Sequence, residues 1–257
     1  LGLASGMTPG EVLHHPMKRL DILEINDQVV KACGLFFTPW NNGCLTDPRT
    51  RLIVQDGRNP LALTRERYDG IISEPSNPWM AGLANLYTPD FFQLARDRLN
   101  DRGIFAQWIQ SYEMDWETFA RLGRTFARAF PDGVLMKIGA GDYLMLGFRG
   151  RKGLDWEAAR HHTEYARRST NVSVANEGFL VHLIIADDLV GLFGEGPVHT
   201  DDRPRLELSA PRKLYGSKLD LDGLIAKRRQ LSDGNRSLLQ NSRDPHKLLD
   251  FLEFGAS

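Results

Sequence analysis

The sequence lacks the features that would place it in several classes of protein. It has only two cysteines, Cys33 and Cys44, and neither has a metal-binding or redox spacing. We therefore expect a reducing, cytoplasmic compartment, with both cysteines as packing residues. No apolar run approaches the ~20 residues of a membrane helix, and no signal peptide is visible. The formal net charge is −1, with 32 basic residues spread along the chain, which argues against a nucleic-acid partner.

A metal site is not expected either. The pairs His14-His15 and His161-His162 each lack a third ligand at a suitable spacing. Zinc sites in proteins need three or four ligands. Both pairs are therefore interpreted as solvated surface, and no metal cofactor is predicted.

What the sequence does contain is an alternation of strands and helices over its first 150 residues. Apolar runs predict strands at 19–25, 51–57, 68–75, 104–109, 134–138 and 143–148. Helices are expected at 9–16, 27–37, 89–99 and 116–130. This alternation predicts an α/β fold: a doubly wound, mostly parallel sheet with helices on both faces and an antiparallel pair at one edge.

The pattern loosens after Gly150. Helices are predicted at 156–168 and 177–186, and a polar, partly helical stretch at 231–253. We divide the chain into a nucleoside-binding α/β domain at 1–150, a continuation that closes the site at 151–215, and a helical tail at 216–257.

The chain opens on Leu1–Gly6, which has the pattern of a buried strand end running into a glycine turn. Thr8 to Glu11 then has the form of a capping box, with Thr8 as the cap and Pro9 at the first helical position. The first strand is short of residues and no initiator Met is present, so we expect a fragment of a longer protein.

Candidate ligand-binding residues follow the predicted strands, where ligands bind in open α/β sheets. Gly2, Ala4 and Gly6 let the backbone approach a ligand closely, beside a helix N-terminus. Glu24 ends the second strand, at the position of an acid that bonds a ribose diol. Asp56 ends the third strand, where an acid commonly meets an adenine or its ribose. Their order predicts a nucleoside site.

These residues carry a resemblance to a known family. The turn, Glu24 and Asp56-Gly57 resemble the S-adenosylmethionine-binding fold of methyltransferases and aminopropyltransferases. The stretch YDGIISEPSNPWMAGLANLYTPDFFQLARDRLNDRGIFAQWIQ resembles the gate segment of spermidine synthases. With DGRNPL and HTDDRPRLELSAPRKLY, residues 1–215 resemble spermidine synthase-like domains that are fused behind membrane helices. The resemblance implies decarboxylated S-adenosylmethionine or S-adenosylmethionine as cofactor, bound by Gly2, Ala4, Gly6, Glu24, Asp56, Gly57 and Ser73.

The sequence departs from the family at the reacting centre. The family pattern has one Asp at the end of the fourth strand and a second Asp before the loop proline. Here these positions hold Glu74 and Asn77. Glu74 can still act as a base or bind an ammonium group, whereas Asn77 can only form hydrogen bonds. The exchange weakens the case for a polyamine substrate and leaves cofactor binding untouched.

Several side chains after the strand ends can line a substrate pocket. They are Trp79, Trp108, Gln110 and Tyr112. Packing between strand and helix is the alternative for the two tryptophans. Asp201 and Asp202 can close the site from the second half of the chain, or Asp202 can pair with a nearby arginine.

Three functions remain open. The first is an aminopropyltransferase that moves an aminopropyl group from decarboxylated S-adenosylmethionine to an amine (polyamine) acceptor. The second is a methyltransferase acting on a small or cationic acceptor. The third is a non-catalytic adenosyl-binding domain of a membrane protein, which Ala4 and Asn77 favour. The resemblance also leaves open an N-terminal membrane segment or β-domain, and a homodimer.

Overall fold

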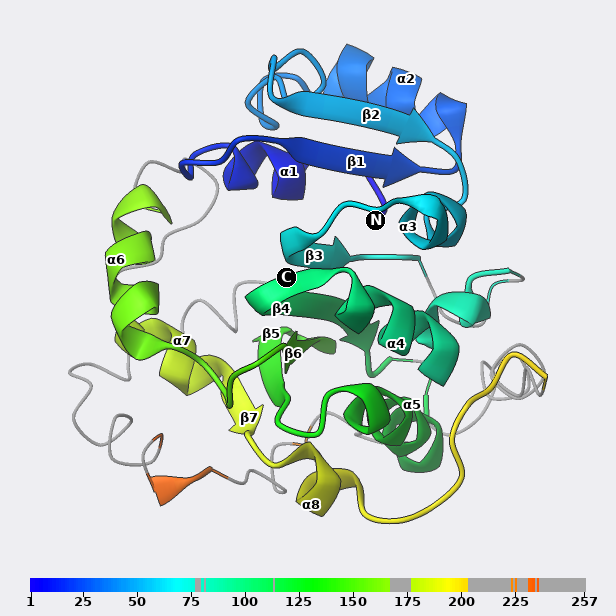
Figure 1. Cartoon of the computed structure of the whole chain (residues 1–257), viewed down its shortest axis with the longest axis vertical. Coiled ribbons are helices and arrows are strands. Elements are labelled where there is room, and N and C mark those ends of the chain that lie inside the picture. The colour runs from blue at the N-terminus through cyan, green and yellow to red at the C-terminus, as the bar shows by residue number, and fades with distance from the viewer. Residues whose placement is uncertain are drawn as a thin grey trace. The chain divides into compact units, whose positions relative to one another are not determined.

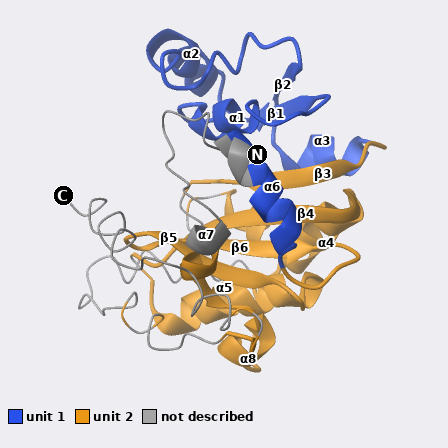
Figure 2. Cartoon of the chain, turned by 90° about the vertical axis from the view of Figure 1, so that its left-hand side faces the viewer, with its two compact units in different colours: residues 1–64, 154–177 blue, residues 65–153, 178–257 orange. Residues whose placement is uncertain are grey.

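The computed structural model describes residues 1–76, 80, 82–112, 114–166, 177–202, 223, 225, 231–233 and 235. Its contacts define two compact units (Figure 2): unit 1 comprises residues 1–64 and 154–177, and unit 2 comprises residues 65–153 and 178–257. The division predicted at 1–150, 151–215 and 216–257 concerns function and stays a prediction. The tail at 216–257 falls almost entirely outside the described residues.

Unit 1 contains a parallel pair of strands, β1 (Leu20–Glu24) and β2 (Thr50–Val54). Helix α2 (Asp27–Phe36) connects them, as predicted, and α3 (Arg58–Leu63) follows β2. The strand arrows of β1 and β2 point the same way in Figure 1, and the register runs from Leu20 opposite Thr50 to Glu24 opposite Val54. Both strands therefore end at the same edge of the unit.

The first helix, α1 (Met7–Val12), begins earlier and ends sooner than the sequence predicted. Gly6 is the N-cap, with a left-handed φ of 80°, so the capping box predicted at Thr8 was wrong. The glycine turns the chain into the helix before Thr8 is reached. Pro9 is tolerated inside the first turn because the first four N–H groups of a helix have no intrahelical partner.

Unit 2 contains a five-stranded sheet. Across the sheet, its strands are β3 (Tyr68–Ser73), β4 (Leu99–Gln110), β6 (Asp142–Phe148), β5 (Val134–Gly139) and β7 (Ile184–Ala186). The β3–β4 pair is parallel and the other three pairs are antiparallel. The predicted α/β fold with an antiparallel edge is confirmed, and the edge has one more strand than predicted. The sheet of unit 2 is, however, mostly antiparallel rather than mostly parallel, because β3–β4 is the one parallel pair among its described strands.

The additional strand corrects the helix predicted at 177–186. Helix α7 (Glu177–Leu183) ends at Leu183, and the next three residues form β7. β7 pairs with β5 through Leu135 opposite Ala186 and Met136 opposite Ile184. Its residues are buried, and β-branched side chains such as Ile184 pack well on a sheet surface. Tertiary packing therefore overrides the helical pattern.

Helices α4 (Pro89–Asp97) and α5 (Trp116–Ala129) pack on the sheet of unit 2. Their phenylalanines form the centre of its core. The Phe92 ring lies 5.1 Å from Phe126 and 5.9 Å from Phe105, between ring centroids, and Phe105 stacks on Phe130 at 5.5 Å. Burying each ring stabilises the unit by about 1.5–3 kcal/mol. This core fixes β3 and β4, whose carboxyl ends carry the predicted acceptor residues.

Three shorter or outlying helices complete the described structure. The 3₁₀ helix η1 (Ala84–Tyr87) precedes α4, and α8 (Leu189–Phe193) follows β7. Helix α6 (Trp156–Ala166) belongs to unit 1. Among the described residues, no helix combines the length and apolarity that a membrane crossing requires.

Candidate functional site

Three residues of the glycine turn at the start of unit 1 have a left-handed backbone conformation. The φ angles of Gly2, Ala4 and Gly6 are 87°, 46° and 80°. A Cβ on Gly6 would lie 2.8 Å from Cys33 Sγ and 2.9 Å from Cys44 Sγ, so glycine is required there. Ala4 carries its Cβ in a conformation that costs roughly 1–2 kcal/mol. Gly2 and Ala4 are exposed, so the outer side of the turn is accessible.

Residues 1–3 lie beside β1 without forming the predicted strand end. The Gly2 N–H donates to Leu23 O at 2.9 Å, and Leu3 is buried. The φ of Gly2 interrupts the extended backbone that a continuous strand needs. The predicted turn is nonetheless next to the end of β1.

Glu24, the last residue of β1, holds this turn. Its Oε2 accepts a hydrogen bond from Leu3 N at 2.9 Å, and its Oε1 accepts one from Asn26 N at 2.9 Å. Only 8% of the residue is exposed. Each carboxylate oxygen has a second lone pair, so Glu24 can still accept from a diol. The sequence placed Glu24 at the strand end but did not reveal its bond to the turn.

Asp56 and Gly57 follow β2 at the same edge. Asp56 Oδ1 accepts from Arg58 N at 2.9 Å, at the start of α3. A Cβ on Gly57 would lie 2.7 Å from Leu1 Cδ2, so this glycine packs directly against the first residue of the chain. Glu24, Asp56 and Gly57 thus follow the ends of β1 and β2, and Gly2 and Ala4 lie in the turn that Glu24 holds. The sixth residue predicted to bind the cofactor in this part of the chain, Gly6, is buried against the two thiols.

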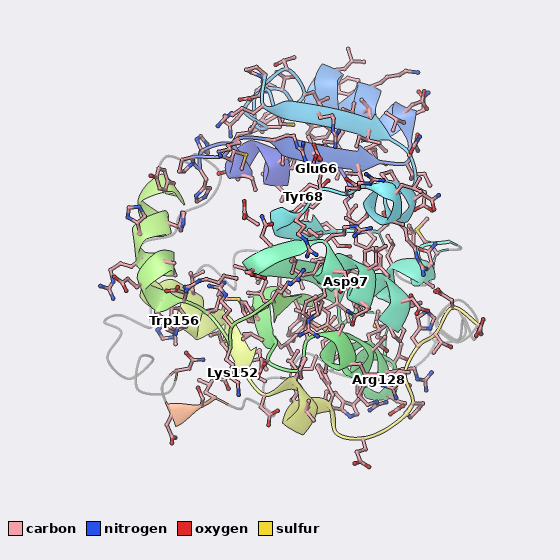
Figure 3. All side chains as sticks on the ribbon, viewed as in Figure 1. Glu66, Tyr68, Asp97, Arg128, Lys152 and Trp156 are labelled. Carbon is pink, nitrogen blue, oxygen red and sulfur yellow. The ribbon has the colours of Figure 1, made fainter. Side chains whose placement is uncertain are left out.

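The carboxyl end of β3 in unit 2 carries two buried polar side chains. Ser73 is opposite Gln107 in the parallel β3–β4 register, and both are fully buried. Neither Ser73 Oγ nor Gln107 Oε1 has a hydrogen-bond partner within the described part of the chain. Buried polar atoms without partners are rare, and a ligand or an ordered water can supply the missing hydrogen bond. Tyr68, labelled in Figure 3, marks the other end of β3.

The sequence predicted Ser73 and missed Gln107. The available signal was a glutamine inside the apolar run IFAQWI, because a polar side chain in a buried strand needs a partner. Glu74 follows Ser73 directly and is partly buried. Asn77 and Trp79, the other predicted residues of this loop, lie outside the described residues.

Tyr87, at the end of η1, lies against the carboxyl end of β4. Its hydroxyl donates to Trp108 O at 3.2 Å, and Gln107 Nε2 donates to the same oxygen at 3.1 Å. Complete burial raises the pKa of Tyr87 above its usual value, so the phenol stays a neutral donor. The predicted Gln110 is buried at the end of β4, and Tyr112 follows it with 45% of its surface exposed. Their contact with a substrate remains a prediction.

Asp201 and Asp202 are exposed and follow a buried histidine that the sequence did not single out. His199 is 1% exposed. Its backbone N–H donates to Thr125 Oγ1 at 2.9 Å, and its Nε2 lies 3.1 Å from Ala84 O. The arginines suggested as partners for Asp202 lie outside the described residues.

The two histidine pairs contact each other. Within unit 1, the His15 ring lies 5.6 Å from the ring of His162 and 5.5 Å from that of Tyr165, between centroids. His161 and His162 are exposed, but His15 is partly buried, which corrects its interpretation as solvated surface. No group of three or more His, Cys, Asp and Glu side chains that can hold a metal occurs in the described ranges.

Comparison with known proteins gives a consistent assignment. Residues 2–138 match the spermine/spermidine synthase domain, a shorter range than the 1–215 of the resemblance. The polyamine aminopropyltransferase of Korarchaeum cryptofilum is 27% identical over 130 residues, which are 51% of this chain and 40% of that protein. The enzyme of the same name from Saccharolobus solfataricus is 28% identical over 134 residues, 51% and 44% of the two chains. The chain therefore spans less than half the length of these curated relatives.

A solved structure supports the fold. A spermidine synthase in complex with the transition state analogue AdoDATO superimposes with a TM-score of 0.60 and 20% identity, covering 75% of this chain and 67% of that one. The match to the domain covers more than half of the sequence and includes the glycine turn, β1 to β4 and the residues at their carboxyl ends. The chain belongs to the spermine/spermidine synthase family.

Proposed function

We propose that the protein is an aminopropyltransferase, which transfers the aminopropyl group of decarboxylated S-adenosylmethionine to an amine acceptor. The observation that carries the proposal is the bond from Leu3 N to Glu24 Oε2, because it joins the glycine turn and the acid at the end of β1 into one ligand-binding edge. The names of the curated relatives support the same activity.

The edge of unit 1 is proposed to bind the adenosyl part of the cofactor. In this proposal, the exposed backbone at Gly2 and Ala4 lies against the amino-acid-like tail of the cofactor. Glu24 accepts hydrogen bonds from the ribose diol with its remaining lone pairs. Asp56 and Gly57 lie beside the adenine. The residues present are oxygen acceptors and exposed backbone, which suits a nucleoside; the cofactor itself supplies a sulfonium-activated carbon.

The end of β3 in unit 2 is proposed to bind the acceptor. The amine nitrogen attacks the carbon beside the sulfonium, the new C–N bond forms as the C–S bond breaks, and methylthioadenosine leaves with the bonding electron pair on its sulfur. Glu74 binds the amine and takes up the released proton, a contribution of about 10²–10⁴ in rate. Ser73 Oγ and Gln107 Oε1 offer the buried hydrogen-bonding atoms beside it.

The remaining parts of the proposal come from the resemblance. Within the stretch that resembles the family's gate, residues 74–88 are called the gate segment, and Asn77 and Trp79 are assigned to it. Gln110, Tyr112, Asp201 and Asp202 are assigned to the acceptor pocket. A polyamine as acceptor, a cytoplasmic location, continuity with a membrane segment or β-domain, and a homodimer belong to the same proposal.

A transfer assay tests the proposed function. The purified protein is incubated with decarboxylated S-adenosylmethionine and a panel of diamines and triamines, and mass spectrometry detects methylthioadenosine and the extended amine. We expect both products in equal amounts. Absence of product from a protein that binds methylthioadenosine would overturn the proposal. Methyl transfer from S-adenosylmethionine would assign the methyltransferase alternative instead.

A further inference from the structure

Two neighbouring residues of α5 hold the chain segment that leads to Asp201 and Asp202. Arg124 Nη1 donates to Phe193 O and Arg124 Nε to Pro197 O, each at 3.1 Å. Thr125 Oγ1 accepts from the backbone N–H of His199 at 2.9 Å. The segment 193–199 is therefore bound to one turn of α5 at three points, although about 70 residues separate them along the chain.

The guanidinium of Arg124 is suited to this role because its charge is compensated. Its Nη2 lies 2.7 Å from Glu117 Oε1, one of the carboxylate oxygens at the start of α5. A Cβ on Gly196 would lie 2.9 Å from Arg124 Cζ, so the glycine lets the backbone lie directly on the guanidinium. The path of the segment is thus fixed by close packing as well as by hydrogen bonds.

His199 connects this segment to the gate segment. Its Nε2 lies 3.1 Å from Ala84 O, at the first residue of η1. A carbonyl oxygen only accepts, so Nε2 carries the hydrogen in this contact. Three residues later, the Tyr87 hydroxyl donates to Trp108 O. The last part of the gate segment is therefore attached at two points, to β4 through Tyr87 and to α5 through His199.

We propose that His199 is a positioning residue of the acceptor site. By joining Ala84 to α5, it fixes the end of the gate segment relative to Asp201 and Asp202, which follow His199 by two and three residues. Pre-ordering these two segments removes an entropic cost that the acceptor would otherwise meet on binding. The inference rests on the proposed function and adds to it the group that orders the acceptor pocket.

Kinetics of three variants test the role. His199→Ala removes the contact, His199→Asn keeps a polar group that is too short to reach Ala84 O, and His199→Gln can place an amide N–H near the position of Nε2. We expect His199→Ala and His199→Asn to raise the KM for the amine about tenfold, with a smaller change in kcat and an unchanged methylthioadenosine affinity. His199→Gln should recover most of the loss. His161→Ala, which changes an exposed histidine of unit 1, is the matched control.

Hydrogen exchange gives a readout that does not need activity. In His199→Asn, exchange should become faster both at residues 83–88 and at residues 196–202, while the amides of unit 1 stay unchanged. Calorimetry with 1,4-diaminobutane should show weaker binding in the same variant. Equal KM values in wild type and His199→Asn, or parallel losses of amine binding, methylthioadenosine binding and melting temperature, would overturn the inference. A wild type that binds the diamine without transfer would contradict the proposed function alone.

Discussion

Glu24 Oε2 accepts a hydrogen bond from the backbone N–H of Leu3 at 2.9 Å. The acid at the end of β1 therefore supports the glycine turn at the start of unit 1. Its second oxygen accepts from Asn26 N, next to the start of α2. One carboxylate thus joins three consecutive parts of the unit, so we expect a change at Glu24 to lower stability and, under the proposed function, to weaken ligand binding as well.

Replacing Glu24 should affect both ligand binding and stability. Glu24→Ala removes an acceptor from a ribose diol and should weaken methylthioadenosine binding by about 1.5–3 kcal/mol. It also leaves the buried N–H of Leu3 without its partner, which costs roughly 1–3 kcal/mol of stability. Glu24→Gln keeps one carbonyl acceptor and should lose less on both counts. Calorimetry and thermal melting measure the two effects; unchanged affinity in Glu24→Ala would remove Glu24 from the ligand site.

Gly6 should tolerate no side chain. In Gly6→Ala, the new Cβ meets both thiol sulfurs and the left-handed backbone adds strain, so we expect a loss of about 2–4 kcal/mol from strain and overpacking together. Adding Cys44→Ala to Gly6→Ala should restore part of the steric loss but not the backbone strain. Denaturant unfolding of the two single variants and the double variant measures this coupling. Additive losses would show that the sulfurs do not limit the space at Gly6.

Ala4 allows the opposite substitution, in which a Cβ is removed from a left-handed position rather than added to one. It holds the left-handed φ of 46° with a Cβ, so Ala4→Gly should relieve roughly 1 kcal/mol of strain. Glycine also loses more freedom on folding, which offsets about 0.5–1 kcal/mol. The net change in the free energy of unfolding should therefore be small, in contrast to Gly6→Ala. A large destabilisation in Ala4→Gly would mean that the Ala4 methyl group makes contacts that hold the turn.

Much of unit 1 could be predicted from the sequence because its signals are local. Apolar runs placed β1 and β2, and Glu24 and Asp56 follow from where those runs end. The capping of α1 could not be predicted, because it depends on the left-handed conformation of Gly6 and on the close packing of Cys33 and Cys44, which leaves no space for a Cβ at this residue.

The interactions in unit 2 that were missed are non-local. Gln107 becomes a candidate site residue only once its register with Ser73 is known. The link between His199 and Ala84 joins residues 115 positions apart, for which a single sequence holds no signal. Residues 184–186 form a strand because they pair with the edge of β5, whereas the sequence pattern alone favoured a continuing helix.

The lowered pKa of His15 predicts that the protein loses stability in acid. Burial, and then the neighbouring charges of His162 and His14, lower the pKa of His15 below 6.5, while Glu11 raises it; Tyr165 is the other ring in contact. A lowered folded-state pKa means that the unfolded chain binds more protons. The contribution of His15 is therefore present above about pH 6.5 and is lost as the pH falls through its folded-state pKa.

Denaturant unfolding between pH 7.5 and 5 measures this effect. Wild type should lose more stability on acidification than His15→Gln, which has no titrating ring at this position. His161→Ala, at an exposed position of α6, should follow wild type more closely. Identical pH dependence in wild type and His15→Gln would contradict the prediction.

Substitution of Glu74 should lower turnover without changing cofactor binding. It follows the buried Ser73 at the end of β3, and it is the one carboxylate left where the family pattern has two acids. Glu74→Gln removes the base and the counter-charge of the amine, so transfer should fall by about 10²–10⁴. Methylthioadenosine contacts the edge of unit 1 in the proposal, so its affinity should stay nearly constant.

The companion change Asn77→Asp restores the second acid of the family pattern and should strengthen diamine binding, because an ammonium group in a partly dry site needs a counter-charge. Rates from the transfer assay and affinities from calorimetry are compared for wild type and both variants; transfer that survives in Glu74→Gln would show that another group takes up the proton.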